Sequence, residues 1–139
     1  MQITRQADYA VRAVLHLAGL GNGDRAPTSH IAHEQHIPPS FLAKIVSQLS
    51  VAGVVQTSRG ARGGVSLARH PSEISLLEVI EAIDGPISLN ECVFDASSCT
   101  LGDKCPVHTI WCDAQKDLVK RLGATDFASL ANGQNGKGV

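Results

Sequence analysis

The sequence contains no run of eighteen or more apolar residues, so it lacks a segment long enough to cross a bilayer as a helix. Its first residues, MQITRQADYA, carry an arginine and an aspartate and lead into no apolar stretch typical of an export signal. We therefore expect a cytoplasmic protein without membrane attachment. In a reducing compartment, clustered cysteines are more often metal ligands or redox groups than structural disulfides.

Sequence patterns of common enzymes are also missing. There is no G-x-S-x-G motif, no paired-carboxylate motif stands out, and the Gly-rich stretch RGARGG lacks the Gly-Lys-Ser/Thr ending of a phosphate-binding loop. The stretch HIAHEQH, with His30, His33 and His36, lacks the carboxylate and cysteine neighbours of a strong zinc motif, and we interpret these residues as surface histidines. There is no internal repeat. We expect a protein that is not an enzyme.

The charge is unevenly distributed along the chain. The 139 residues, 43% of them hydrophobic, are enough for one core, and the net charge is only −1. Through Ser72, however, seven lysines and arginines face three acids, whereas from Glu73 onward five face ten. The N-terminal part therefore carries +4 and the rest −5. A basic half of this kind suggests a polyanionic partner.

Helical periodicity dominates the N-terminal part. Thr4 can cap a first helix that GNGD ends, and Thr28 or Ser29 can cap a second helix through about Gln35. The two prolines of HIPPS then turn the chain and start a third helix. Its buried stripe is expected to be Leu42, Ile45, Leu49 and Ala52, and its outward face Ser40, Ala43, Lys44 and Ser47. This arrangement matches a helix-turn-helix, which would carry Ser40, Lys44 and Ser47 into a DNA groove.

The next segment, VVQTSRGARGGVSLARH, predicts two short strands at Val54–Thr57 and Val65–Ala68. The loop between them holds Arg59, Arg62 and three glycines, which let its backbone approach a phosphate. A hairpin with merely solvated arginines is the alternative. Behind a helix-turn-helix we favour a wing that contacts DNA.

The C-terminal half predicts two further helices. Ser75 and Glu78 form a capping box, the residues Leu76, Val79, Ile80 and Ile83 supply an apolar face, and DGP ends that helix. Pro106 opens a long helix whose stripe is Val107, Ile110, Trp111, Leu118 and Leu122. The simplest partner that can bury this apolar stripe is the same helix in a second copy of the chain. A homodimer also suits double-stranded DNA with a pseudo-palindromic operator.

The fold class expected is therefore mainly α with a small β-hairpin wing: a winged helix-turn-helix domain plus a long C-terminal dimerisation helix. The expected divisions are a DNA-binding region at residues 1–72, a connecting helix with a cysteine-bearing loop at 73–104, a dimerisation helix with a short C-terminal segment at 105–131, and a disordered Gly/Asn-rich tail at 132–139.

Four stretches in order resemble a known family: RQADYAVRAVLHLA, SRGARGGVSLAR, SLLEVIEAIDG and CTLGDKCPVHTIW. Together they resemble the bacterial winged-helix regulators that include the iron-sulfur cluster regulator IscR and the nitric-oxide-sensing repressor NsrR, over roughly residues 1 to 131. The resemblance implies a homodimeric transcription factor that binds a [2Fe-2S] or [4Fe-4S] cluster. Its cysteine ligands would be Cys92, Cys99 and Cys105.

The chemistry of three cysteines agrees with that expectation. Thiolates are the soft ligands that iron-sulfur clusters require, and a cluster normally takes four protein ligands, so one position is left for another residue. The resemblance offers His108, as in IscR-type members, and Asp8, which in NsrR-type members reaches the cluster from the other subunit. Six residues separate Cys92 from Cys99, one more than in IscR-type members. We therefore favour Asp8, with His108 as the alternative.

Other interpretations of the cysteines remain open. With His108 they form a CCCH set that suits structural zinc, and without metal they can act as a thiol switch in a winged-helix regulator. A redox or cluster-carrier protein that binds no DNA would leave the basic helix-turn-helix unexplained. Cys112 is interpreted as a small buried apolar residue without a function of its own.

Overall fold

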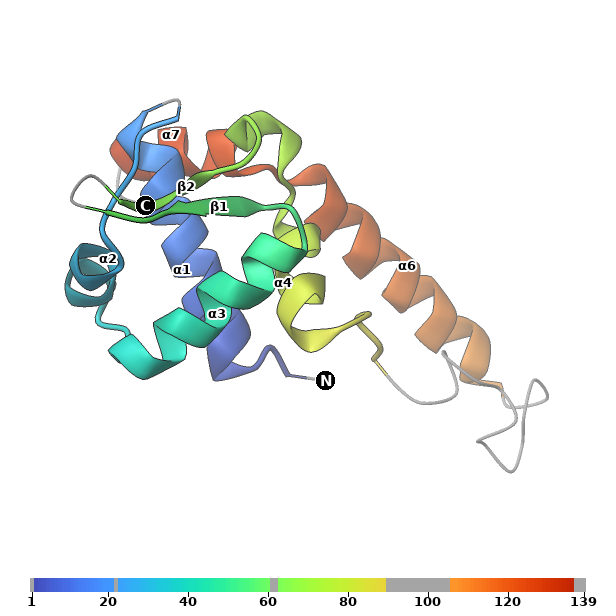
Figure 1. Cartoon of the computed structure of the whole chain (residues 1–139). Helices are drawn as coiled ribbons and strands as arrows, with labels where there is room; N and C mark the ends of the chain where they lie inside the picture. The colour runs from blue at the N-terminus through green and yellow to red at the C-terminus, as the bar shows by residue number, and fades with distance from the viewer. Residues whose placement is uncertain (1, 22, 61–62, 90–105, 137–139) are drawn as a thin grey trace.

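The computed structural model describes residues 2–21, 23–60, 63–89 and 106–136, with side chains as far as Gly133. The expected fold class is confirmed, because the described chain is mostly helical with one two-stranded hairpin. Its elements in order are α1 (Arg5–Leu20), α2 (Thr28–Gln35), α3 (Pro39–Val51), β1 (Val55–Ser58), β2 (Gly64–Leu67), the 3₁₀ turn η1 (Pro71–Glu73), α4 (Leu76–Asp84), α6 (His108–Ala124) and α7 (Phe127–Gly136) (Figure 1). None of the helices in these ranges is long and apolar enough to cross a membrane.

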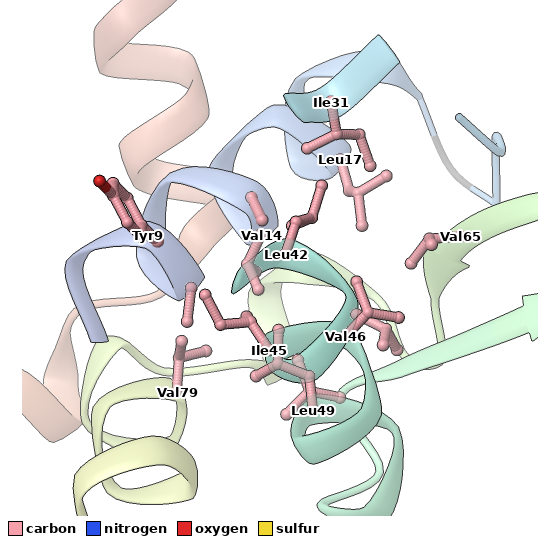
Figure 2. Close-up of a cluster of buried hydrophobic side chains, with 14 of the residues drawn as sticks. Tyr9, Val14, Leu17, Ile31, Leu42, Ile45, Val46, Leu49, Val65 and Val79 are labelled. Carbon is pink, nitrogen blue, oxygen red and sulfur yellow. The ribbon is translucent and has the colours of Figure 1, made fainter. Parts of the chain in front are cut away.

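Helix α1 runs through the centre of the body. As expected, Thr4 caps it: the backbone N–H of Ala7 donates to Thr4 Oγ1 at 3.1 Å. The Thr4 hydroxyl also donates to Asp84 Oδ1 at 2.5 Å, which ties the start of α1 to the end of α4. The buried face of α1 contains several alanines, so α3, α4 and α7 can pack against it. Figure 2 shows Val14 and Leu17 of α1 directed towards Leu42 and Ile45 of α3.

The helix-turn-helix forms as predicted, with two local differences. The cap of α2 is Pro27, whose carbonyl accepts from the N–H groups of His30 and Ile31, whereas Thr28 already lies inside the helix. In α3, Leu42, Ile45 and Leu49 are buried, but Ala52 is exposed. The expectation for Ala52 was wrong because α3 ends at Val51 and Gly53, with φ +78°, turns the chain so that Val54 enters the core.

The hairpin β1–β2 is antiparallel, with Val55 opposite Leu67 and Ser58 opposite Gly64. Each strand lies within one residue of its predicted bounds. A β-bridge joins Val65 to Ala26, just before α2, through hydrogen bonds of 2.9 and 2.8 Å. A Cβ at Gly64 would come within 2.6 Å of the Ala26 carbonyl oxygen, so this close approach requires glycine. The bridge fixes the hairpin beside the helix-turn-helix.

The predicted cap of α4 is present, since the Glu78 N–H donates to Ser75 Oγ at 3.1 Å. The Glu78 carboxylate pairs with the Arg69 guanidinium, which also donates to the Glu73 carbonyl at 3.0 Å. Val79 and Ile80 of the predicted apolar face are buried, and Leu76 and Ile83 are partly buried against the core. The helix ends at Gly85, as the DGP stop predicts.

Helix α7 was not predicted. Phe127 at its start is fully buried, and its N–H donates to the Ile74 carbonyl at 3.1 Å, while the Leu76 N–H donates to the Thr125 carbonyl at 2.8 Å. These bonds bridge the chain before α4 to the chain after α6. Helix α7 then packs on α1 and continues to Gly136, whereas the composition led us to expect a disordered tail from residue 132.

Candidate DNA-binding surface and sensor site

Helix α3 presents its expected outward face. Ser40, Lys44 and Ser47 are all exposed, and so is Ala43 between them. The opposite face of α3 holds the helix against α1 through Leu42, Ile45 and Leu49 (Figure 2). Short polar side chains and one lysine on a rigid, exposed helix are suited to contacts with base edges and phosphates.

The wing contributes a second cation. Arg59 follows β1 directly and is exposed, whereas Arg62 lies outside the described residues. Arg69, after β2, has a structural role instead, because it donates to the Gly53 carbonyl at 3.3 Å and pairs with Glu78. Arg59 is therefore the described cation of the wing that is available for a phosphate contact.

The three cysteines of the predicted sensor, Cys92, Cys99 and Cys105, lie outside the described residues, but both flanks of their segment are described. On the first flank, the Leu89 N–H donates to Gln115 Oε1 at 2.9 Å, and Gln115 Nε2 donates to the Ile87 carbonyl. The second flank leads directly into α6 at His108. Gln115 and His108 are seven residues apart on one helix, or about 10 Å. The described residues on both sides of the cysteine segment therefore lie beside α6.

His108, the first residue of α6, lies one turn from Cys112. The distance from His108 Nε2 to Cys112 Sγ is 3.5 Å, and Cys112 is half-buried rather than buried. The other ring nitrogen, Nδ1, is buried and has no hydrogen-bond partner among the described residues. Because His108 Nδ1 has no hydrogen-bond partner in the described part of the chain, it can bind a metal ion or a polar group of the residues that precede α6. In the described ranges, no three His, Cys, Asp or Glu side chains are grouped so as to hold a metal.

Asp8 has a different environment on the first turns of α1. Its Oδ2 accepts from Arg12 at 2.6 Å, and about half of its side chain is exposed. It lines a hollow of about 760 Å³ that also includes Thr4, Arg5 and Tyr9. Arg12 lies 5.3 Å from the centre of the Tyr9 ring and donates to the Gln35 carbonyl at 3.3 Å. Arg12 thereby connects Asp8 to the last turn of α2.

The histidines of α2 are exposed, as predicted for surface residues. His16 of α1 lies behind them, with its ring 5.6 Å from that of His30 and its Nδ1 3.1 Å from Gln35 Nε2. Burial lowers the pKa of His16, and the neighbouring His30 lowers it further, while Glu34 acts in the opposite direction. A neutral imidazole at this point can accept from the Gln35 amide and hold α2 against α1.

An exposed reading helix beside a hairpin wing defines a winged helix-turn-helix DNA-binding protein. Residues 3–133 match the family model Rrf2, described as an iron-dependent transcriptional regulator. The chain belongs to the Rrf2 family of transcriptional regulators. Its members are cytoplasmic DNA-binding proteins that work as dimers, and they are not enzymes.

Individual relatives agree with this assignment. The chain is 33% identical over 134 residues to the regulator IscR of Escherichia coli, covering 96% of this chain and 82% of that protein. It is equally similar over 139 residues to a putative helix-turn-helix regulator of Mycobacterium tuberculosis, with 96% and 83% coverage. Among solved structures, CymR, the global cysteine regulator of B. subtilis, has a TM-score of 0.81 at 26% identity, with coverage of 95% and 97%. IscR of T. potens shares the fold, with a TM-score of 0.71 at 23% identity and coverage of 99% and 91%.

Replacing Arg59 with alanine is expected to weaken binding to every DNA sequence rather than to change sequence preference. A lost phosphate contact releases fewer counterions, so the slope of log affinity against log salt should become shallower by about 0.9. Fluorescence anisotropy over a salt series measures this slope. Lys120→Ala, which removes an exposed cation of α6, is the matched control and should leave the slope unchanged. An unchanged slope in Arg59→Ala would exclude Arg59 from the DNA interface.

Proposed function

We propose that this regulator senses redox state, nitric oxide or iron-sulfur status through a cluster bound by Cys92, Cys99 and Cys105. The family description, iron-dependent regulator, and the similarity to IscR support an iron-based sensor. The structural observation that carries the proposal is the half-exposed carboxylate of Asp8, which lines an open hollow and is connected through Arg12 to the end of α2. Three thiolates with one position left for another donor suit an iron-sulfur cluster, which would respond to oxidants and nitric oxide.

For the fourth ligand we propose Asp8 of the other subunit. Its carboxylate lines a hollow large enough to receive a loop from a partner. Asp8 is also connected to the DNA-reading helices, since Arg12 binds both its carboxylate and the Gln35 carbonyl at the end of α2. If Asp8 leaves Arg12, the guanidinium loses its carboxylate partner and the contact that ties α2 to α1 is weakened. His108 is the alternative ligand, supported by its unpartnered Nδ1, but it lies on α6 and offers no comparable connection to α2.

Comparing Asp8→Ala with His108→Ala tests this assignment in anaerobically purified protein. Asp8→Ala is expected to alter the visible absorption and the DNA affinity, whereas His108→Ala should leave the absorption close to that of the wild type. Asp117→Ala, which removes an exposed carboxylate of α6, is the control for a lost acidic charge. The opposite pattern, in which only His108→Ala changes the absorption, would identify His108 rather than Asp8 as the fourth ligand. Colourless wild-type protein with stoichiometric zinc would exclude a cluster and support the zinc alternative.

A further inference from the structure

A hollow of about 370 Å³ lies between the two helices of the helix-turn-helix. Its floor is formed by three buried apolar residues, Ala32 of α2, Ile37 of the turn and Leu42 of α3. Its rim is formed by the exposed residues Thr28, Ser29, His33, Pro39 and Ala43. The hollow therefore combines an apolar floor with an opening at the surface.

The opening of this hollow is continuous with the DNA-reading face. Ala43 belongs to both, because it lines the hollow and lies one helical turn from Ser40 and from Ser47 on the outward face of α3. Figure 1 shows α2 beside the start of α3, and these helices are in contact. A base pair that Ser40 contacts in the major groove would therefore lie next to the opening of the hollow.

The apolar floor restricts what part of a base pair can enter. The edges of the bases in the major groove carry hydrogen-bond donors and acceptors. The polar side chains of the rim can bind these groups, but burying them on the floor against Ile37 and Leu42 without a partner is costly. The C5-methyl group of thymine is the apolar group that the major groove presents. We propose that the hollow between α2 and α3 receives a thymine C5-methyl group and makes each half-site of the operator select thymine at one position. The inference rests on α3 being the DNA-reading helix.

Deoxyuridine substitution tests this inference, because uracil differs from thymine only by that methyl group and pairs identically with adenine. The probe is a duplex that the protein selects from a randomised pool, with each thymine replaced in turn by deoxyuridine. Burying one methyl group in the complex is expected to raise the affinity about fourfold. We expect a loss of about fourfold at one position in each half-site and no measurable change at the other thymines.

A variant that fills the hollow provides the matched comparison. A helical leucine side chain is directed towards the preceding turn, so in Ala43→Leu it would cover the hollow beside Pro39. This variant should bind the thymine and deoxyuridine duplexes equally. Ser50→Ala, on the exposed surface of α3 outside the hollow, should keep the fourfold difference.

Two results would overturn the inference while leaving the reading helix in place: equal affinity of the wild type for every deoxyuridine duplex, or a methyl effect that persists unchanged in Ala43→Leu. A different failure would contradict the reading helix itself. In that case the protein would select no sequence from the pool, or substitutions at Ser40 and Lys44 would leave the selected sequence unchanged.

Discussion

Replacing Cys99 with serine is expected to abolish retention of the cluster, so that the protein is colourless after anaerobic purification. A serine hydroxyl has nearly the size of a thiol, but it is a harder and far less acidic ligand. With only three cysteines in the segment, one lost thiolate leaves two soft ligands. The same loss is expected for Cys92→Ser and Cys105→Ser. Iron and sulfide content and the visible absorption spectrum measure it.

Cys112→Ser is the control for that experiment, because it removes the remaining cysteine of the chain. The side chain of Cys112 is half-buried on α6, where its sulfur contacts His108. We expect this variant to keep its iron, sulfide and colour. A coloured Cys99→Ser together with a colourless Cys112→Ser would show that the assigned ligand set is wrong.

Phe127→Ala is expected to lower the free energy of unfolding by about 3–5 kcal/mol, the usual range for truncating a fully buried phenylalanine. The Phe127 side chain has 0% of its surface exposed within the core. The hydrogen bonds from the Phe127 N–H to the Ile74 carbonyl and from the Leu76 N–H to the Thr125 carbonyl hold the backbone in place and limit collapse around the cavity. Urea titration at one fixed protein concentration, followed by circular dichroism, measures the change.

Phe41→Ala makes the same substitution at a surface position of α3. Phe41 is 42% exposed, and its ring centre is 6.2 Å from that of Tyr9. Loss of this aromatic pair is expected to cost about 1 kcal/mol. If both variants unfold at the same urea concentration, Phe127 does not anchor α7 in the core.

The elements predicted from the sequence were those with strong local signals. Thr4 and Ser75 cap α1 and α4 as expected, because their side chains bond to N–H groups only three residues away. Helix α7 has no comparable signal: ANGQNG is rich in residues that disfavour helices in isolation. Its position depends on Phe127 and on the bridge to Ile74, which are contacts with a distant part of the chain.

The same distinction applies to the candidate sites. The outward face of α3 follows from helical periodicity, so Ser40, Lys44 and Ser47 could be placed on the surface from the sequence alone. Gln115 and the contact from Arg12 to Gln35 were missed. Each joins a side chain to backbone more than twenty residues away, and no local pattern marks such a pair. The hollow between α2 and α3 likewise depends on how the two helices pack.

The bridge between Ser75 and Asp126 has a consequence for how this architecture can evolve. Helices α4 and α6 are in contact, and the bridge holds the start of α4 beside the end of α6, so the chain that connects these two helices is an excursion whose ends are held in place. Lengthening such an excursion adds only a small, logarithmic entropy cost and does not displace Phe127. Insertions, deletions and new ligands can therefore accumulate there while the reading helix stays unaltered. One DNA-binding body can accommodate sensors of different chemistry.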